Sequence, residues 1–115
     1  MKFTFKRYER LRKKKEFDNV FVNGQWIKGN LINVCYALST NRKVGFIVSK
    51  KISKKAVIRN KVKRRLREIF RLNKYILPNK VHLVVIAKQG VEKVNFSELE
   101  YDVKQIFQKI HNQTD

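Results

Sequence analysis

The segment from Lys54 to Tyr75 combines a helical repeat of apolar residues with a one-sided distribution of charge, and it restricts the fold more than any other part of the chain. At about 100° per residue, one set of side chains falls within about 40° of Val62 on a helical wheel. These side chains are Ile58, Leu66, Ile69, Asn73 and Ile76. The pattern predicts a long helix that is N-capped by Ser53, ends before Pro78 and buries one face in a core.

The opposite face of this predicted helix is cationic. It carries Arg59, Asn60, Lys63, Arg64, Arg67, Arg71 and Lys74. A solubilising helix face usually alternates its charges, whereas here like charges recur one turn apart and repel each other. Such a face lowers stability unless anions lie against it, and the planar fork of arginine suits paired hydrogen bonds to phosphate oxygens. We therefore interpret the face as a nucleic-acid-binding surface and not as a solvated charge run.

The overall charge agrees with that interpretation. The chain has a formal net charge of +19 over 115 residues. Residues 1–15 hold eight lysines and arginines and residues 50–74 hold twelve, so these two blocks contain most of the 28 in the chain. In so small a protein, the many positive charges repel one another, and we expect an acidic partner that offsets this repulsion. Nucleic acid is favoured over an anionic membrane surface, because a membrane would require a second anchor that is not evident in the sequence.

The sequence also favours a cytoplasmic protein. No apolar run approaches the roughly 20 residues that span a bilayer, and the first fifteen residues lack the apolar core of a secretory signal. The single cysteine, Cys35, can form neither an internal disulfide nor a cysteine metal cluster, which fits a reducing compartment. Its simplest interpretation is a small buried hydrophobic side chain.

The apolar patterns elsewhere predict two helices and three strands. Residues 14–22 carry three apolar side chains at helical spacing and predict a short helix. The apolar stretches 30–40 and 43–50 are separated by a polar turn, which predicts a hairpin. Residues 81–87 form a nearly continuous apolar run that is typical of a strand buried on both faces.

The last helix is predicted from about residue 96. Ser97 and Glu100 have the spacing of a capping box at the start of a helix. The helix that follows has an apolar stripe of Leu99, Val103, Ile106 and Ile110, which should pack on the sheet.

Residues 56–67 follow the pattern Ala-Val-x-Arg-Asn-x-x-Lys-Arg-x-x-Arg. With this pattern, the region from Val44 to Phe70 resembles the signature region of the bacterial ribonuclease P protein subunit, a family that has the same pattern on a helix. The matching residues in this chain are Ala56, Val57, Arg59, Asn60, Lys63, Arg64 and Arg67. The Ser-Lys-Lys that precedes the helix in the family is present at residues 49–51, after Gly45. The likeness extends upstream to Phe17, Phe21 and Gly24 and downstream to residues 81–88.

The resemblance implies an α+β two-layer sandwich with elements in the order helix-strand-strand-helix-strand-helix. It also implies a mixed sheet with an unusual left-handed β-α-β crossover, whereas general rules predict a right-handed crossover in about 98% of cases. The chain would form a single domain, residues 1–115. This domain would include a basic N-terminal segment at 1–13, an RNA-binding helix at about 54–75 and a C-terminal helix at about 96–111.

The resemblance further implies an accessory role in ribonuclease P, an endoribonuclease of tRNA maturation. In that family the RNA subunit is the catalyst and removes the 5′ leader of precursor tRNA with Mg²⁺. We therefore expect no catalytic residue in the protein and Mg²⁺ held mainly by the RNA subunit, with metal ligands in the protein unknown. The expected partners are the catalytic RNA subunit and the precursor tRNA 5′ leader, with no membrane and no DNA.

Two surfaces divide this work by analogy with the family. The surface for the RNA subunit is expected to contain Lys50, Lys51, Arg59, Asn60, Lys63, Arg64, Arg67 and Arg71. The surface for the leader, between the first helix and the sheet, is expected to contain Lys13, Lys14, Phe17, Phe21 and Cys35. Because leader sequences vary, stacking on aromatic rings suits this surface better than reading of base edges. Without the resemblance, both phenylalanines would be assigned to the core.

Three alternatives remain open from the sequence. A ribosomal protein or an RNA chaperone could share the same size and charge. A nuclease active without RNA is disfavoured, because His82 and His111 do not form a general acid and base pair and the acidic residues do not group into a metal site. A role at a membrane surface is the weakest of the three.

Overall fold

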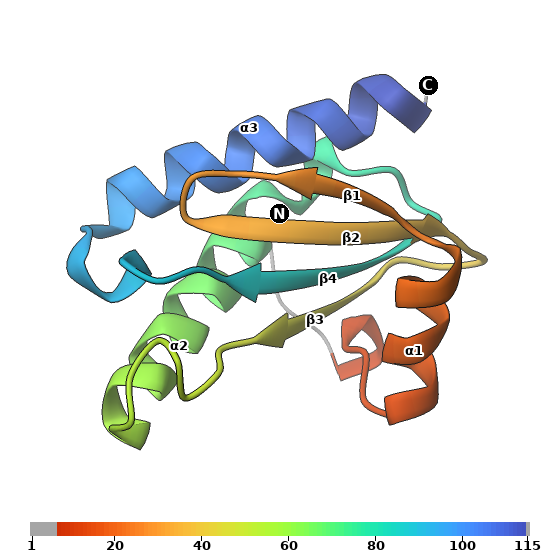
Figure 1. Ribbon diagram of the computed structural model, residues 1–115. Coiled ribbons are helices and arrows are strands. Elements are labelled where there is room, and N and C mark those ends of the chain that lie inside the picture. The colour runs from red at the N-terminus through yellow and green to blue at the C-terminus, as the bar shows by residue number, and fades with distance from the viewer. Residues whose placement is uncertain (1–6, 115) are drawn as a thin grey trace.

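The computed structural model describes residues 7–114, and Figure 1 shows how its elements are arranged. Residues 1–6 of the predicted basic segment therefore lie outside the described part of the chain. The helices are α1 (Lys14–Asn23), α2 (Ala56–Asn73) and α3 (Phe96–Thr114), and the strands are β1 (Gln25–Lys28), β2 (Ile32–Leu38), β3 (Lys43–Ile47) and β4 (Val81–Ala87). Short 3-10 turns are η1 (Arg7–Glu9), η2 (Lys74–Ile76) and η3 (Val91–Lys93).

The four strands form one mixed sheet in the order β1-β2-β4-β3. β2 is antiparallel to both β1 and β4, whereas β3 is parallel to β4. The predicted hairpin of residues 30–40 and 43–50 is therefore wrong, since β4 separates β2 from β3. β4 is the strand with the most continuous apolar sequence, and a central position buries most of it on both faces. Strand β1 was missed, because it has four residues and a single buried side chain, Ile27.

The connection from β3 through α2 to β4 is a left-handed crossover. Figure 1 shows the two parallel strands pointing in the same direction, with α2 behind the sheet as the chain passes from β3 to β4. That arrangement has the hand opposite to the usual right-handed connection. The α+β class and the unusual crossover predicted from the resemblance are both confirmed.

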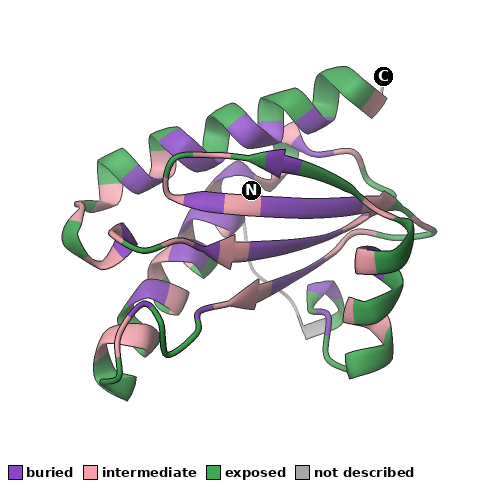
Figure 2. Ribbon diagram, viewed as in Figure 1, coloured by how far each residue is buried: buried purple, intermediate pink, exposed green. Residues whose placement is uncertain are grey.

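Helices α2 and α3 pack side by side on one face of the sheet and enclose the main core, and Figure 2 shows their buried sides turned towards the strands. The predicted stripe of α3 is confirmed, and so is the centre of the α2 stripe around Val62. The stripe of α2 is wider than predicted, because it also contains Phe70, which is completely buried. The ring of Phe70 lies 6.4 Å from that of Phe107 and 6.3 Å from that of Phe46, edge to face in both pairs.

The predicted capping residues of the two long helices need correction. Helix α2 begins after Lys55, and Ser53 is not its N-cap. The Ser53 hydroxyl instead accepts a hydrogen bond from the backbone N–H of Lys55, 3.1 Å away, within the preceding turn. Helix α3 begins at Phe96, as predicted, but Asn95 caps it in place of Ser97, because Asn95 Oδ1 accepts from the N–H of Glu98 at 2.8 Å.

A buried carboxylate on α3 fixes the turn between β1 and β2. Asp102 is 8% exposed, and its oxygens accept from the backbone N–H groups of Asn30, Leu31 and Ile32 at 3.2, 2.9 and 3.3 Å. Gly29 in the same turn has no room for a side chain, since an added Cβ would lie 2.6 Å from Ile106 Cδ1. This contact ties the turn to the helix layer. Within residues 7–114, no helix is long and apolar enough to cross a membrane.

We expect Asp102→Asn to destabilise the fold by about 1–3 kcal/mol, because a neutral amide accepts these hydrogen bonds less strongly and adds a buried N–H₂ group without a partner. Urea unfolding followed by circular dichroism measures the change. Asp18→Asn, at an exposed position on α1, is the matched control and should leave the midpoint in place. A midpoint for Asp102→Asn equal to that of the control would show that the carboxylate does not hold the turn.

Candidate nucleic-acid interface

The outer face of α2 presents cations that acids of the described chain do not neutralise. Asn60, Arg64 and Arg67 are exposed, and Lys63 is half-buried. Among the described residues, no acidic side chain forms an ion pair with Lys63, Arg64 or Arg67. The apolar stripe on the opposite side of the same helix is packed in the core, so these side chains project from a rigid element.

The other three cations of the predicted cationic face have partners within the protein. Arg59 is half-buried and donates from Nη1 to the Ser53 carbonyl at 2.9 Å. Arg71 forms an ion pair with Glu68, and its Nε donates to Glu68 Oε2 at 3.0 Å. These contacts lower the pKa of the Glu68 carboxyl group. Lys74, which the helical wheel placed on the cationic face, turns instead to Glu9, with 3.0 Å between Nζ and Oε1.

The start of α2 concentrates positive charge further. Lys50 and Lys51 are exposed in the turn that leads to the helix, and Lys54 and Lys55 are exposed immediately before it. The first turn of α2 contains no acidic residue, so the positive end of the helix dipole adds to these lysines instead of being offset. Backbone N–H groups at such a helix start favour anions, phosphate in particular.

Helix α1 lies across one end of the sheet, on the face opposite to the one that α2 and α3 cover (Figure 1). A second apolar cluster fills the space beneath it. This cluster consists of Leu11, Val20, Cys35 and Val84, each at most 6% exposed. Phe17 packs over Gly45, where an added Cβ would lie 2.4 Å from the ring atoms Cε1 and Cζ. The space between α1 and the sheet is therefore packed with side chains, and the predicted leader surface cannot be an open cleft there.

The prediction that Cys35 contacts the leader needs correction for the same reason. Its side chain is completely buried, and Sγ lies 3.4 Å from the Val20 carbonyl oxygen, to which the thiol donates. Burial raises the pKa of the Cys35 thiol, so the sulfur stays protonated at neutral pH. The alternative interpretation from the sequence, a small buried hydrophobic residue, is confirmed. Phe17 and Phe21 are both half-buried at the edge of this cluster.

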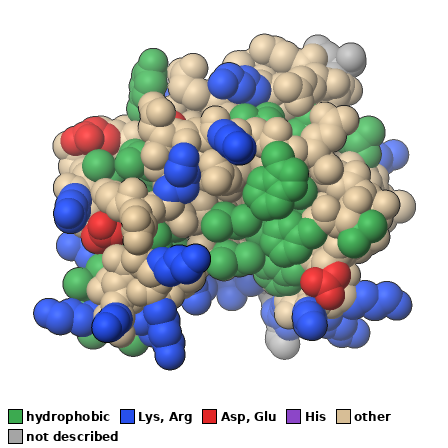
Figure 3. All heavy atoms as spheres, viewed as in Figure 1, with side chains coloured by type: hydrophobic (Ala, Val, Ile, Leu, Met, Phe, Trp, Pro, Cys, Tyr) green, Lys and Arg blue, Asp and Glu red, His purple; other side chains and the backbone are tan. Residues whose placement is uncertain are grey.

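A partly exposed apolar surface lies beside α1, and we call it the sheet patch. It consists of Phe21, Trp26, Ile47 and Ile86. The rings of Phe21 and Trp26 are stacked, with centroids 5.8 Å apart and planes within 6°. Trp26 is 50% exposed, so part of this aromatic pair is open to solvent. Figure 3 shows apolar side chains gathered over the sheet on this side of the molecule.

Trp26 was missed by the sequence analysis. It lies in β1, a strand too short to give a clear alternating pattern. The sequence contained one signal, because Trp26 stands two residues after Gly24, which follows the predicted first helix. The chain changes direction sharply at this glycine, and the Trp26 ring therefore lies beside the last turn of that helix. The packed Gly24 supports this turn, because an added Cβ would lie 2.4 Å from the Val20 carbonyl oxygen.

The two lysines that were predicted to contact the phosphates of the leader lie at the start of α1. Lys13 and Lys14 are exposed. Glu16 holds this helix start in place, because its Oε1 accepts from the backbone N–H groups of Arg12 and Lys13 at 3.0 and 3.2 Å. Its other oxygen accepts from Lys43 Nζ at 3.0 Å. The hydrogen bond from Arg12, together with those from Lys43 and Lys13, lowers the pKa of Glu16 from 4.5 to about 2.

In residues 7–114, no three side chains of His, Cys, Asp or Glu come together in a way that could hold a metal ion. His82 lies on β4, where its Nε2 is 2.7 Å from Asn41 Oδ1. Burial, and then the nearby Lys43, lower the pKa of His82, so the ring is neutral at neutral pH.

A cationic helix on one layer and an exposed aromatic pair on the other define a small RNA-binding protein of the α+β class. The family model described as ribonuclease P matches residues 5–111. The chain is 40% identical over 103 residues to the ribonuclease P protein component of Syntrophomonas wolfei, which covers 87% of this chain and 85% of the relative. It is 36% identical over 113 residues to the same component of Desulfosudis oleivorans, with 93% and 89% covered.

Solved structures agree with these sequence matches. The ribonuclease P protein of Thermotoga maritima superposes with a TM-score of 0.80 at 30% identity, covering 89% of this chain and 97% of that one. The protein of Staphylococcus aureus, at 24% identity and a TM-score of 0.79, has the same fold and covers 88% of this chain and 94% of that one. The chain belongs to the ribonuclease P protein family.

We expect the contribution of Glu16 to stability to disappear in acid. Its pKa is lower in the folded state, so the stabilisation is complete above pH 4.5 and is lost as the pH falls through about 2. The difference in unfolding free energy between the wild type and Glu16→Gln should therefore shrink between pH 4.5 and pH 2, measured by urea unfolding. Asp18→Asn, at an exposed position on the same helix, is the control. A pH-independent difference for Glu16→Gln would refute the assigned contacts.

Proposed function

We propose that this chain, as the protein component of ribonuclease P, assists a catalytic RNA subunit in removing the 5′ leader from precursor tRNA. The observation that carries the proposal is the match of residues 5–111 to the ribonuclease P family. It is supported by Lys63, Arg64 and Arg67 on α2, none of which forms an ion pair with an acid of the described residues. Nothing in the comparisons favours a ribosomal protein or an RNA chaperone. The catalytic groups are proposed to belong to the RNA.

The outer face of α2 is the proposed contact with the RNA subunit. Its predicted residues are Lys50, Lys51, Arg59, Asn60, Lys63, Arg64, Arg67 and Arg71. Arg64 and Arg67 are the strongest members, since both are exposed and neither forms an ion pair with a described acid. Arg71 already forms an ion pair with Glu68, so a phosphate that binds Arg71 would compete with the Glu68 carboxylate. Four lysines at the start of α2 extend the same surface.

The sheet patch is the proposed contact with the single-stranded leader. Unpaired bases stack on aromatic rings irrespective of their sequence, and the exposed ring of Trp26 provides such a surface. Phe21 supports that ring from the side of α1. Lys13 and Lys14 at the start of the same helix are proposed to attract the leader backbone. Phe17 has a supporting role in this proposal, because it holds α1 against Gly45.

Mg²⁺ is proposed to be held mainly by the RNA subunit. The acidic side chains of the described residues do not gather into a site, so we assign no metal ligand to the protein. Neutralisation of crowded phosphates by α2 would allow the RNA to reach its active form at lower Mg²⁺ concentration. A cytoplasmic location is proposed on the ground that precursor tRNA is the substrate.

Reconstitution with the RNA subunit at low Mg²⁺ tests the function. We expect the protein to restore cleavage of precursor tRNA that the RNA alone performs poorly, and Arg67→Ala to require more protein for the same rate. Loss of one phosphate contact should also reduce the slope of log affinity against log salt by about 0.9 in a duplex-like context. Lys104→Ala, at an exposed position on α3, is the matched control. Cleavage by the protein alone would contradict the assisting role.

Removal of the aromatic pair should weaken binding of the leader selectively. We expect Trp26→Ala and Phe21→Ala to reduce affinity for leader-bearing precursor more than for mature tRNA, with stacking worth about 1–3 kcal/mol per base. Binding to the reconstituted holoenzyme is measured for both RNAs. Tyr101→Ala removes an exposed aromatic ring from α3, away from the sheet patch, and serves as the control. Equal losses for both RNAs would show that the pair acts only in packing.

A further inference from the structure

Residues 8–12, which precede α1, run along the outer edge of strand β3, and we call this segment the N-terminal ledge. Arg10 pairs with Val44 in a parallel bridge, and the N–H of Leu11 donates to the Val44 carbonyl at 3.0 Å. Glu9 and Leu11 are 4% and 6% exposed, whereas Arg10 and Arg12 are exposed. This alternation is that of an extended chain with one side facing inward. Tyr8, in the turn η1 just before it, is 68% exposed.

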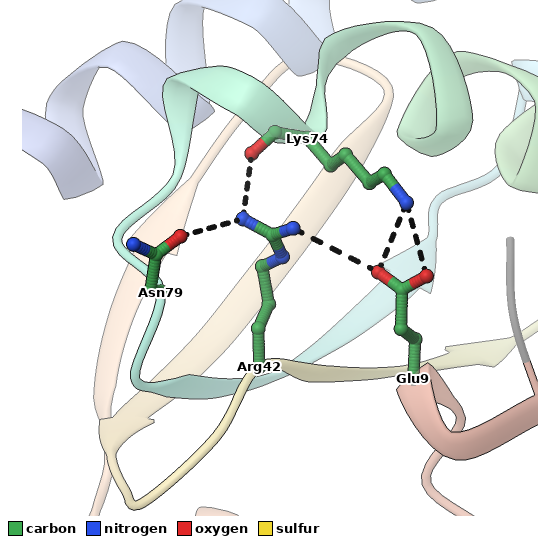
Figure 4. Close-up of polar contacts among 4 residues, drawn as sticks. All are labelled: Glu9, Arg42, Lys74 and Asn79. Carbon is green, nitrogen blue, oxygen red and sulfur yellow. Dashed lines mark hydrogen bonds and ion pairs between the residues drawn. The ribbon is translucent and has the colours of Figure 1, made fainter. Parts of the chain in front are cut away.

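A buried ionic cluster holds one end of this ledge (Figure 4). Lys74 Nζ donates to the two carboxylate oxygens of Glu9 at 3.0 and 3.2 Å, and Arg42 lies 3.8 Å from the same carboxylate. Arg42 also donates to the Lys74 carbonyl and to Asn79 Oδ1, both at 3.3 Å. The side chain of Glu9 is only 5% exposed. Burial of such a cluster adds little net stability, so its main effect here is to fix the position of the chain at Glu9.

Glu16 holds the other end of the ledge. Its carboxylate accepts from the backbone N–H of Arg12 and from Lys43 Nζ, both at 3.0 Å. The segment 8–12 is therefore tied to η2 and the β3 side of the sheet through Glu9, and to α1 through Glu16. On its outer side, Tyr8, Arg10, Arg12 and Lys43 together line one surface hollow. The charge of Glu16 is offset by Lys43, which leaves the hollow cationic.

We propose that this hollow on the N-terminal ledge binds unpaired nucleotides of RNA, with a base stacked on Tyr8 and the adjoining phosphates against Arg10 and Arg12. An exposed ring beside guanidinium groups on a fixed backbone is the combination that binds single strands without reading their sequence. The ledge lies beside β3, whereas Trp26 lies on β1 at the opposite edge of the sheet, so it is a separate contact from the sheet patch. The inference rests on the proposed function, because it adds a contact for the same RNA.

The first test is binding of a fluorescent oligouridylate, ten nucleotides long, to the purified protein. Tyr8→Ala should weaken binding at least fivefold, which corresponds to the lower limit for loss of one stacked base, whereas Tyr8→Phe should retain the affinity. Arg12→Ala should lower the salt slope by about 0.7. Tyr101→Ala is matched to Tyr8→Ala, because both rings are 68% exposed. Thermal unfolding of each variant confirms that the fold is unchanged.

The second test identifies the RNA that occupies the ledge. Tyr8→Ala is compared with the wild type in binding the isolated RNA subunit, and then, in the reconstituted holoenzyme, in binding leader-bearing precursor and mature tRNA. Weaker binding of precursor alone assigns the ledge to the leader, and weaker binding of the RNA subunit assigns it to that subunit. Either result supports the proposal.

If Tyr8→Ala and Tyr101→Ala bind every RNA, including the oligouridylate, with equal affinity, the proposed RNA contact at the N-terminal ledge is refuted. If Phe21→Ala and Arg67→Ala still weaken their respective complexes in that case, the proposed function stands without it. If those two variants also bind normally, the proposed function fails as well.

Discussion

Burial of β4 on both faces is the constraint on which the rest of the structure depends. Val81, Leu83, Val85 and Ala87 point into the core beneath α2 and α3, and Val84 points into the cluster beneath α1. A strand with so few polar side chains is stable only with a neighbour on each edge and a helix layer over each face. The chain meets this requirement by inserting β4 between β2 and β3, so that α2 must cross the sheet to connect β3 with β4.

The crossover in turn determines where the charge goes. Because the apolar side of α2 packs on the sheet, its like-charged residues are forced outward together, without enough acids nearby to neutralise them. The proposed leader surface is on the other layer, beside α1, and the ledge is at the β3 edge. The cationic face of α2 and the two proposed contacts therefore lie on separate parts of the domain surface. The electrostatic self-repulsion that results is relieved when phosphates bind.

The elements with long, regular patterns were predictable, and those defined by long-range contacts were not. Helices α2 and α3 follow from apolar stripes of several turns, and β4 follows from seven nearly continuous apolar residues. The hairpin failed because residues 30–40 and 43–50 have the pattern of two strands, but pairing depends on competition from β4, some 40 residues further along the chain. The two capping predictions failed for different reasons. The Ser53 hydroxyl is engaged by the N–H of Lys55 in the turn before α2, and Asn95 caps α3 in place of Ser97.

By itself, the sequence determined the helical and strand segments, the cationic face of α2 and the family, because each depends on residue types at fixed short spacings. Only the tertiary structure decided that Cys35 is sealed beneath α1, that Lys74 turns to Glu9, and that Trp26 stacks on Phe21. Each of these outcomes depends on which side chains meet after the sheet is assembled. Burial and pairing are properties of the whole packed domain, so a local pattern can indicate a residue's chemistry but not the neighbours that engage it.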